Sequence, residues 1–291
     1  MIPPYQRIHV VINPASGKGQ PVLKYLNDVC KEHGVEWDIS LTRKYGDAYE
    51  QAKAALAHGV DLIVGCGGDG TQHEIANAVI GTGKPMGILP GGTGNGFATE
   101  MKIPADFRKA VEVLCTSAHV RNVDAIRVGD QYCIQRLYAG IEPEQQVSRE
   151  HKNRYGILAY ALMTSKQLKQ SIDAPLTLTI DGQRIETHSL KCYVVNSGRG
   201  GAGMSIDEAD FRVDDGILDV FVLSRNPISM LAAAERFFQI PSLKARMYYW
   251  RGRNITIECE PSKAIWTDGE LFGRTPVTAS VVPGALPVVV P

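Results

Sequence analysis

A run of glycines around one carboxylate is the clearest chemical feature of this sequence. The stretch Cys66-Gly67-Gly68-Asp69-Gly70-Thr71-Gln72-His73-Glu74 follows the apolar run 61–64 and precedes apolar residues at helical spacing. In such a strand, turn and helix, backbone N–H groups come close to a ligand, and the helix start favours negative charge. We therefore expect a phosphate-bearing ligand. Asp69 would act there through a divalent metal or by positioning a hydroxyl for phosphoryl transfer; alternatively, Asp69 only caps a helix.

A second glycine-rich turn, Pro90-Gly91-Gly92-Thr93-Gly94-Asn95-Gly96-Phe97-Ala98, follows the next apolar run, Met86-Gly87-Ile88-Leu89. Two such turns, about one helix apart, predict neighbouring strand ends in one parallel sheet. Ligands bind at the carboxyl ends of the strands in sheets of this kind. Neither turn contains the common ATP-binding pattern Gly-x-x-x-x-Gly-Lys-Ser/Thr, and the dinucleotide fingerprint is absent after the first strand.

Carboxylates cluster beside glycines at two later points. The run 210–216 holds three carboxylates, and a hard divalent ion prefers oxygen ligands of this kind; the alternative is a solvated turn. In Thr267-Asp268-Gly269-Glu270, a hairpin turn explains Asp268-Gly269 but not Glu270. If Glu270 faces the glycine turns, it could serve as a general base or a metal partner. A third glycine-rich run, 196–203, is most simply a flexible turn.

Composition argues against several classes of protein. The chain has 291 residues, enough for two ordinary domains or one large one. Its 31 basic and 31 acidic residues balance, which argues against a protein that coats nucleic acid. The six cysteines show no Cys-x-x-Cys spacing, so neither a zinc site nor a disulfide framework is indicated. Because neither a signal peptide nor a membrane-spanning run is visible, we expect an intracellular protein without a transmembrane segment.

Hydrophobic periodicity divides the chain near residue 120. Before that point strands alternate with helices, which predicts an open, mostly parallel sheet. The expected strands are 7–13, 35–41, 61–64 and 86–89, and the expected helices are 21–33, 46–58, 74–80 and 104–114. After it, short alternating runs predict antiparallel sheet, with a hairpin turn at Asp181-Gly182. The expected strands there are 123–128, 132–137, 176–180, 190–195, 218–223, 247–250 and 255–259, with two more in 277–290 and helices at 155–168 and 227–240.

These motifs together resemble the diacylglycerol kinase catalytic-domain family, and most closely its soluble bacterial lipid kinases, which are related to sphingosine kinases. Gly-Gly-Asp-Gly-Thr alone is only moderately specific, because NAD kinases and phosphofructokinases share it, but the ordered set is highly specific. The set comprises Asn13-Pro14 with Ser16-Gly17, Gly67 to Thr71 with Glu74 and Asn77, Pro90 with Gly92 to Asn95 and Phe97-Ala98, Asn196 with Gly200-Gly201, Asp215-Gly216 with Leu218 to Val220, and Asp268 to Glu270.

The resemblance implies a two-domain fold of class α/β plus β. A Rossmann-like nucleotide domain would comprise residues 1–120 and the returning strands 277–291, and a β-sandwich-like domain would comprise residues 121–276. ATP would lie between them, with Mg²⁺ as the metal. The implied catalytic residues are Glu270, as proton acceptor, and Asp69. The structural magnesium site falls on Asp215 with the carbonyls of Arg212 and Ile217. Candidate nucleotide contacts are Asn13, Thr42, Gly68, Asp69, Gly70, Thr71, Gln72, His73, Glu74, Thr93 and Asn95.

One position departs from the family pattern. After Gly94-Asn95 the family usually has an aspartate that helps to organise the catalytic magnesium, and this chain has Gly96. The loss puts metal placement in question, and Asp69 is the first candidate to replace that carboxylate.

The leading hypothesis is an ATP- and Mg²⁺-dependent kinase that phosphorylates a hydroxyl of a diacylglycerol-like lipid. The protein would be cytoplasmic, would reach its lipid by peripheral contact with a membrane, for which 248–250 is one candidate, and would act in phospholipid metabolism. Two alternatives stay open: a kinase of a small acceptor such as NAD, and a catalytically silent nucleotide- or lipid-binding protein, which Gly96 favours. We also keep a homodimer as a hypothesis, although the sequence pattern alone does not reveal a sheet edge suited to dimerisation.

Overall fold

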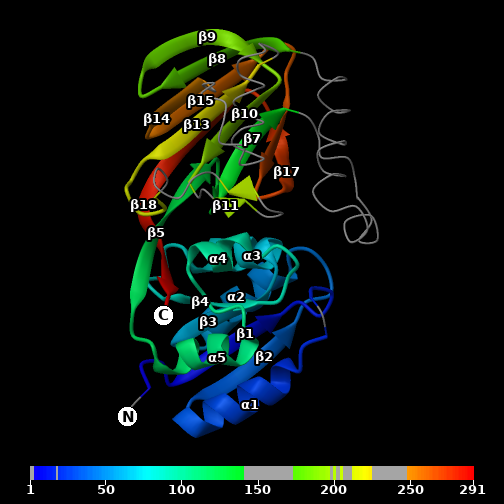
Figure 1. Ribbon diagram of the computed structural model, residues 1–291, viewed down its shortest axis with the longest axis vertical. Coiled ribbons are helices and arrows are strands. Elements are labelled where there is room, and N and C mark those ends of the chain that lie inside the picture. Colours follow the sequence, from blue (N-terminus) through cyan, green and yellow to red (C-terminus); the bar gives the residue numbers. More distant parts are fainter. Residues whose placement is uncertain are drawn as a thin grey trace, which may run out of the picture. The chain divides into compact units, whose positions relative to one another are not determined.

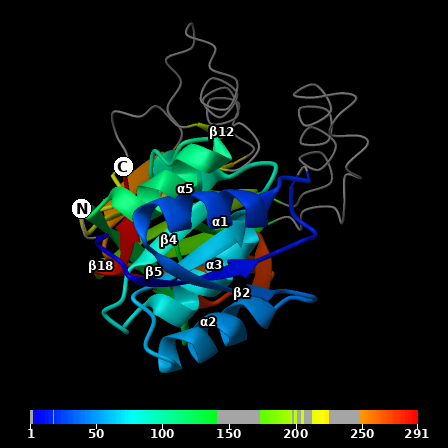
Figure 2. The same ribbon diagram turned by 90° about the horizontal axis from the view of Figure 1, so that it is seen from below.

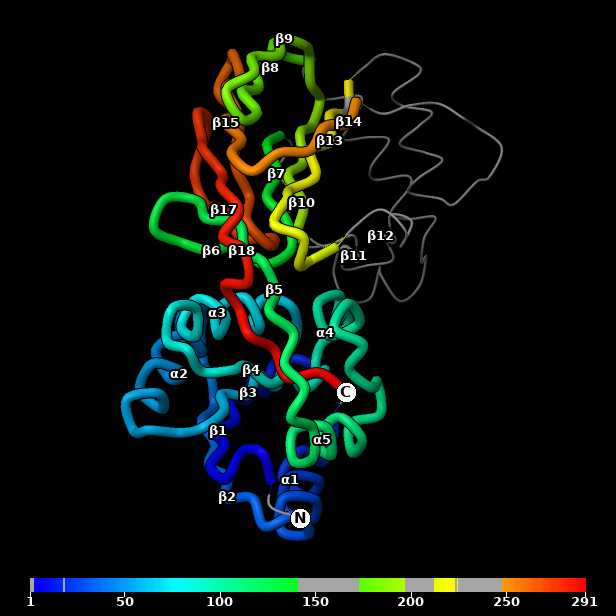
Figure 3. Tube along the Cα trace, turned by 90° about the vertical axis from the view of Figure 1, so that its left-hand side faces the viewer, coloured from blue at the N-terminus to red at the C-terminus, as the bar shows by residue number. Residues whose placement is uncertain are grey.

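The computed structural model describes two compact units (Figure 1; Figure 3). The described residues are 3–17, 19–140, 173–196, 199–200, 204–205, 212–224 and 248–291. Unit 1 comprises Met1–Arg136, Asn196–Ile217 and Val281–Pro291, and unit 2 comprises Leu137–Val195 and Leu218–Ser280. The expected helices 155–168 and 227–240 and most of the third glycine-rich run lie outside the described residues.

Unit 1 is built on a parallel sheet. Strands β1 (Arg7–Ile12), β2 (Glu36–Leu41), β3 (Leu62–Gly67) and β4 (Met86–Pro90) lie in the order β2-β1-β3-β4. The end of β18 (Val277–Val289) continues the sheet, because Val288 pairs in parallel with Met86. The carboxyl ends of β1, β3 and β4 therefore meet at one edge, as the two glycine turns predict.

Helices cover both faces of this sheet. In Figure 2, α1 (Val22–His33) and α5 (Phe107–Thr116) lie on one face, and α2 (Asp47–Ala57) and α3 (Asp69–Val79) lie on the other. Strands β3 and β4 are buried almost throughout, because helices cover them on both sides. Strands in this position need apolar residues on both faces. Helix α1 ends at Gly34, whose φ of 70° is the left-handed conformation that favours glycine. None of the described helices is both long and apolar enough to cross a lipid bilayer.

Further strands complete unit 1. Strand β5 (Val120–Val128) pairs with β18 and with β6 (Gln131–Cys133), and β11 (Arg199–Gly200) pairs with β12 (Met204–Ser205). The expected domain boundary at residue 120 falls inside the first segment of unit 1, which ends at Arg136.

Unit 2 is antiparallel. One sheet has the order β14-β13-β10-β7-β16-β17, and β15 is flanked by β8 and by the start of β18, with β9 at the outer edge beside β8. The strand bounds are β7 Arg136–Gly140, β8 Ala174–Ile180, β9 Gln183–Ser189, β10 Lys191–Val195, β13 Leu218–Leu223, β14 Tyr248–Gly252, β15 Asn254–Cys259, β16 Ala264–Thr267 and β17 Glu270–Arg274. The predicted fold class, an α/β unit plus a β unit, is confirmed.

Both predicted Asp-Gly turns form hairpins. Asp181 and Gly182 join β8 to β9 with φ of 48° and 87°, and Asp268 and Gly269 join β16 to β17 with φ of 48° and 98°. Positive φ at both central residues is the geometry that Asp-Gly favours in two-residue hairpins.

The structure corrects the expectation of two strands in 277–290. One strand, β18, runs from Val277 to Val289. Pro283 and Gly284 in its middle break the periodicity, but the Gly284 N–H donates to the Asp124 carboxylate at 2.7 Å, so its hydrogen bond is made outside the strand ladder. The short helix α4 (Gly96–Glu100) was not predicted, and the polar strand β9 was predicted only through the hairpin turn that precedes it, without bounds.

Asn77 joins α3 to the hairpin of β5 and β6. Its Nδ2 donates to the carbonyl of Tyr132 and its Oδ1 accepts from the N–H of Tyr132, both at 2.8 Å. The Asn77 amide thus takes the place of a neighbouring strand beside β6, because it satisfies both the backbone N–H and the backbone C=O of Tyr132.

We predict that Asn77→Ala lowers the free energy of unfolding by about 1–3 kcal/mol, since the Tyr132 N–H and C=O lose these partners. Urea denaturation of the full chain measures the change. Asn27→Ala, on the exposed side of α1, serves as the control and is expected to stay within about 0.5 kcal/mol of wild type. Equal values for the two variants would contradict the role given to Asn77.

Candidate functional site

Three loops of unit 1 meet backbone to backbone at the carboxyl edge of its sheet. The Gly91 N–H donates to the Gly67 carbonyl at 3.0 Å. A Cβ added at Gly92 would lie 2.5 Å from the Gly68 Cα, and one at Gly91 would lie 3.1 Å from the Gly67 Cα. A Cβ at Gly17, where φ is 91°, would collide with the Gly91 carbonyl. These glycines are thus required by the close approach of the loops.

Asp69 holds the second glycine turn in place. It is the first residue of α3, yet its carboxylate accepts from the N–H groups of Gly96 and Phe97, at 3.1 and 3.0 Å, which begin α4. The Gln135 side chain donates to the same carboxylate at 3.1 Å. Asp69 therefore caps a helix, but α4 and not its own helix.

The N-terminus of α3 has no such cap. Its N-cap residue is Gly68, which has no side chain to accept from the first N–H groups of the helix. Those N–H groups have no partner inside the helix either. Because the helix dipole adds positive potential at this end, the turn 68–71 is suited to bind a phosphate.

Two amide side chains stiffen the loops around this turn. Asn13, directly after β1, donates to the Thr71 hydroxyl at 3.1 Å and accepts from the Ala15 N–H at 3.0 Å. The Asn95 amide bonds both the N–H and the C=O of Gly92 at 2.8 Å, and Asn95 itself has a φ of 50°. The side chains of both candidate contacts are occupied with loop structure, which leaves backbone groups to meet a ligand.

Gln72 and His73 are buried inside unit 1, at 2% and 5% exposure. The Gln72 Nε2 donates to the Gly65 carbonyl at 2.9 Å, and a Cβ at Gly65 would collide with this side chain. In the structure the Gln72 side chain thus supports the strand that carries the turn, and His73 is buried beside it in the sequence.

Glu74 caps a neighbouring helix. Its Oε2 accepts from the N–H groups of Gly46 and Ala48, at 2.9 and 3.1 Å, at the start of α2. Burial raises the pKa of the Glu74 carboxyl, against the lowering effect of those N–H groups. Glu74 therefore links α3 to α2 and supports the loop after β2, where Thr42 lies.

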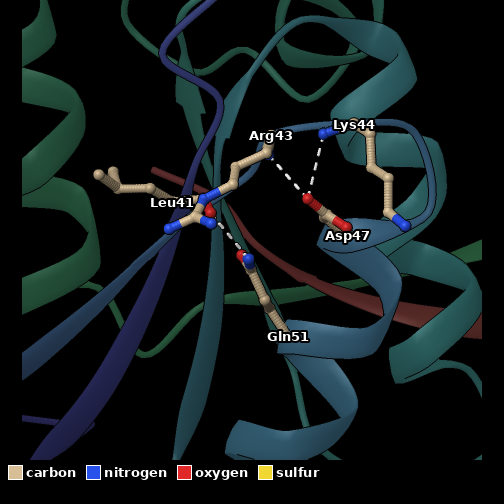
Figure 4. Close-up of a pocket in the computed structure, with 5 residues that line it drawn as sticks. All are labelled: Leu41, Arg43, Lys44, Asp47 and Gln51. Carbon is tan, nitrogen blue, oxygen red and sulfur yellow. Dashed lines mark hydrogen bonds between the residues drawn. The ribbon is translucent and has the colours of Figure 1, made fainter.

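A shallow pocket of about 460 Å³ opens beside that loop (Figure 4). It is lined by Leu41, Arg43, Lys44, Asp47 and Gln51. The Asp47 carboxylate accepts from the N–H groups of Arg43 and Lys44 at 2.8 and 3.1 Å, and these bonds lower its pKa. Thr42 is buried, and its N–H donates to the Ile12 carbonyl at 2.9 Å, so this candidate lies at the base of the loop, directly before Arg43 and Lys44 in the sequence.

The predicted metal residues form a separate loop of unit 1. The Asp215 Oδ1 accepts from the Ile217 N–H at 3.1 Å. The buried Asp124, which no local motif marks as a site residue, accepts from the N–H of Gly216 at 2.6 Å. Carboxylate and carbonyl oxygens here suit a hard cation. Among the described residues, however, no group of three acidic, histidine or cysteine side chains gathers to hold a metal.

Glu270 lies in unit 2. It is the first residue of β17, exposed, and pairs with Thr267 across the hairpin. That Glu270 faces the glycine turns, which belong to unit 1, stays a prediction.

The structure brings most of the predicted nucleotide contacts together. At the carboxyl edge of the unit 1 sheet it places Asn13, Thr42, Gly68, Asp69, Gly70, Thr71, Thr93 and Asn95. Gln135 and Asp124 were missed because each bonds to residues distant in sequence, and no local motif surrounds either one.

Comparison with known proteins agrees with this architecture. Residues 7–128 match the model of the diacylglycerol kinase catalytic domain, and residues 135–290 match that of the YegS C-terminal NAD kinase beta sandwich-like domain. The chain is a member of the diacylglycerol kinase-like family of lipid kinases. The two matches lie end to end and account for nearly all of the chain.

Individual relatives are similar over nearly their full length. A diacylglycerol kinase of Staphylococcus carnosus is 26% identical over 282 residues, covering 93% of this chain and 90% of that protein. A Staphylococcus haemolyticus protein provisionally named a lipid kinase is 28% identical over 278 residues, covering 92% and 88%. The crystal structure of a diacylglycerol kinase from Bacillus anthracis superposes with a TM-score of 0.81 at 25% identity, covering 99% of this chain and 98% of that one.

We predict that Gly92→Ala lowers the free energy of unfolding by about 1–3 kcal/mol, because the new methyl group would overlap the Gly68 backbone. Gly70→Ala is the matched control, since a Cβ there meets no atom within 4 Å. Urea denaturation of both variants measures the difference. A Gly92→Ala protein as stable as Gly70→Ala would show that the two turns do not need their close approach.

Proposed function

We propose that this protein transfers the γ-phosphate of ATP, with Mg²⁺, to a hydroxyl of a diacylglycerol-like lipid. The proposal rests on a difference between the two helix N-termini at the glycine turns. The start of α4 is closed by the Asp69 carboxylate, and the start of α3 has no side-chain cap. The turn 68–71 is thus the candidate anion-binding site. Because the chain belongs to a lipid kinase family, the anion expected there is a phosphate of the nucleotide.

The proposed transfer depends mainly on positioning. Backbone N–H groups of 68–71 would hold the transferable phosphate while the acceptor oxygen attacks phosphorus. The bond from the γ-phosphorus to the bridging oxygen breaks, ADP leaves, and the hydroxyl proton passes to the Glu270 carboxylate. Arg43 and Lys44, which line the pocket beside Thr42, would add positive charge near the nucleotide.

Magnesium would neutralise charge on the phosphates when bound. The structural ion would be held by the Asp215 carboxylate with the carbonyls of Arg212 and Ile217. Asp69 is the candidate to replace the family aspartate at position 96, because its carboxylate accepts from the Gly96 N–H itself. This contact brings a carboxylate to the backbone of residue 96, which supports Asp69 as the candidate.

The lipid acceptor would be reached at a membrane surface. Tyr248 and Tyr249 in β14 are each 40% exposed, and Tyr248 stacks on Trp250 with ring centroids 6.1 Å apart. Aromatic side chains with a polar edge suit the interface between lipid and water, which supports this strand as the contact.

The proposal is tested by transfer of labelled γ-phosphate from ATP and Mg²⁺ to a panel of acceptors in mixed micelles. The panel contains diacylglycerol, monoacylglycerol, sphingosine, ceramide, a polyprenol and NAD. We expect label in a lipid, with diacylglycerol preferred. Label in NAD alone would instead establish a kinase of a small acceptor. ATP binding without any labelled product would establish a silent nucleotide-binding protein.

We predict that Glu270→Ala lowers turnover about 100-fold or more and leaves ATP binding and the unfolding midpoint unchanged, since Glu270 is an exposed proton acceptor. Glu258→Ala, an exposed glutamate on β15, is the control and should retain activity. The measurement is initial rate at saturating ATP. Near-normal turnover of the Glu270 variant would remove its assigned role.

A further inference from the structure

Two of the six cysteines meet inside unit 1. The sulfur atoms of Cys30 and Cys115 lie 3.8 Å apart, within hydrogen-bonding distance for thiols, and the two residues are 0% and 1% exposed. Cys30 belongs to α1 and Cys115 to α5, which lie side by side on one face of the sheet (Figure 2). All six cysteines are free thiols in the described part of the chain, and none has a role in the proposed phosphoryl transfer.

Other contacts already hold these two helices beside each other. Tyr25 of α1 packs on Phe107 of α5 with ring centroids 5.9 Å apart, and the Arg108 guanidinium of α5 pairs with Glu32 of α1 at 3.3 Å. The two thiols lie in the last turns of their helices. Helix ends fray more readily than helix centres. A small movement there can therefore shorten the contact from 3.8 Å to the S–S bond length of about 2.05 Å.

The contact between the thiols also makes Cys30 the more reactive of the two. When the Cys115 thiol donates to the Cys30 sulfur, it lowers the pKa of Cys30, against the raising effect of burial. The same hydrogen bond and burial both raise the pKa of Cys115. Cys66 provides the contrast, because burial alone raises the pKa of its thiol to about 12. Since the thiolate is the reactive form, Cys30 is the expected site of first attack.

We propose that Cys30 and Cys115 form a redox-active dithiol, which hydrogen peroxide converts into an intramolecular disulfide between α1 and α5. The Cys30 thiolate attacks one peroxide oxygen, the O–O bond breaks, and the leaving hydroxide takes up the Cys30 proton as water. The Cys115 sulfur then attacks the sulfur of the Cys30 sulfenic acid, the S–O bond breaks, and a second water leaves with the Cys115 proton. The two thiols are oxidised by two electrons in total, the peroxide is reduced to two waters, and a small dithiol reverses the bond by exchange.

The disulfide would join two elements that support loops of the candidate site. Helix α1 follows the loop that contains Gly17, and α5 packs against β4, which leads into the second glycine turn. The packing of α5 on β4 is tight, because a Cβ at Gly87 would lie 2.6 Å from the Leu114 side chain. The bond would link positions 85 apart in the sequence, and a cross-link of long span restricts the unfolded chain strongly. We therefore expect the oxidised protein to resist unfolding better than the reduced one.

Peptide mapping tests the pair directly. The reduced full chain is treated with hydrogen peroxide in the native state, alkylated in urea, and digested with trypsin without reduction. Trypsin places the two cysteines in separate peptides, 25–31 and 110–121, each with one cysteine. We expect these peptides to be joined, with a loss of two hydrogens, and to separate again after dithiothreitol. Peroxide treatment in urea from the start is the control and should not favour this pair. Unlinked Cys30 and Cys115, or linkage chiefly at other cysteines, would overturn the proposal.

Urea denaturation before and after peroxide tests the effect of the bond on stability. We expect the unfolding midpoint of wild type to rise on oxidation, and that of Cys30→Ala not to rise. Because peroxide also oxidises methionine, each variant is compared with its own untreated sample. Cys259→Ala is the matched control, since it removes the one partly exposed cysteine, and it should keep the rise. An equal rise in Cys30→Ala would overturn the pair, and a mapped cross-link without any rise in wild type would overturn the stabilisation.

Discussion

The two glycine turns of unit 1 lie so close together that no side chain fits between them. A Cβ at Gly92 would reach within 2.5 Å of the Gly68 Cα, and the Gly91 N–H bonds the Gly67 carbonyl. This approach fixes the ends of β3 and β4 relative to each other and leaves backbone groups at the surface of the turns. Since backbone N–H groups carry no rotamer freedom, they bind an anion without first being ordered.

Carboxylates hold the surrounding elements in a consistent way: each accepts backbone N–H groups from a different element. Asp69 of α3 caps α4, and Glu74 of α3 caps α2. Asp124 of β5 accepts from both Gly216 and Gly284, which joins the predicted metal loop to β18. Charge-assisted bonds of this kind are stronger than neutral ones, so the loops around the turn are positioned before a ligand arrives. Helix α3 supplies two of these carboxylates while its own start stays uncapped.

Features set by neighbouring residues could be predicted from the sequence. The Asp-Gly hairpins, the alternation of β and α through residue 118, and the meeting of both turns at one sheet edge follow from local chemistry and the period of apolar residues. Long-range bonds could not be predicted. Gln135 contacts Asp69 across 66 positions, and nothing around Gln135 distinguishes it from a surface glutamine. Helix α4 was missed because Asp69, and not a residue beside it, supplies its cap.

The same contact changes how Gly96 is understood. From the sequence, glycine here means only that the usual carboxylate is absent. In the structure the Gly96 N–H bonds the Asp69 carboxylate at 3.1 Å, so negative charge is present at this backbone although the side chain is not. A cation bound there would meet one carboxylate where the family pattern supplies two, and affinity for hard divalent ions falls as the charge of the ligand set falls. That Asp69 carboxylate is also shared with Phe97 and Gln135, so any ion would compete with the bonds that close α4. If this chain binds a divalent ion there, the expected consequence of Gly96 is weaker binding coupled to the order of the second turn, which differs from a simple loss of the site.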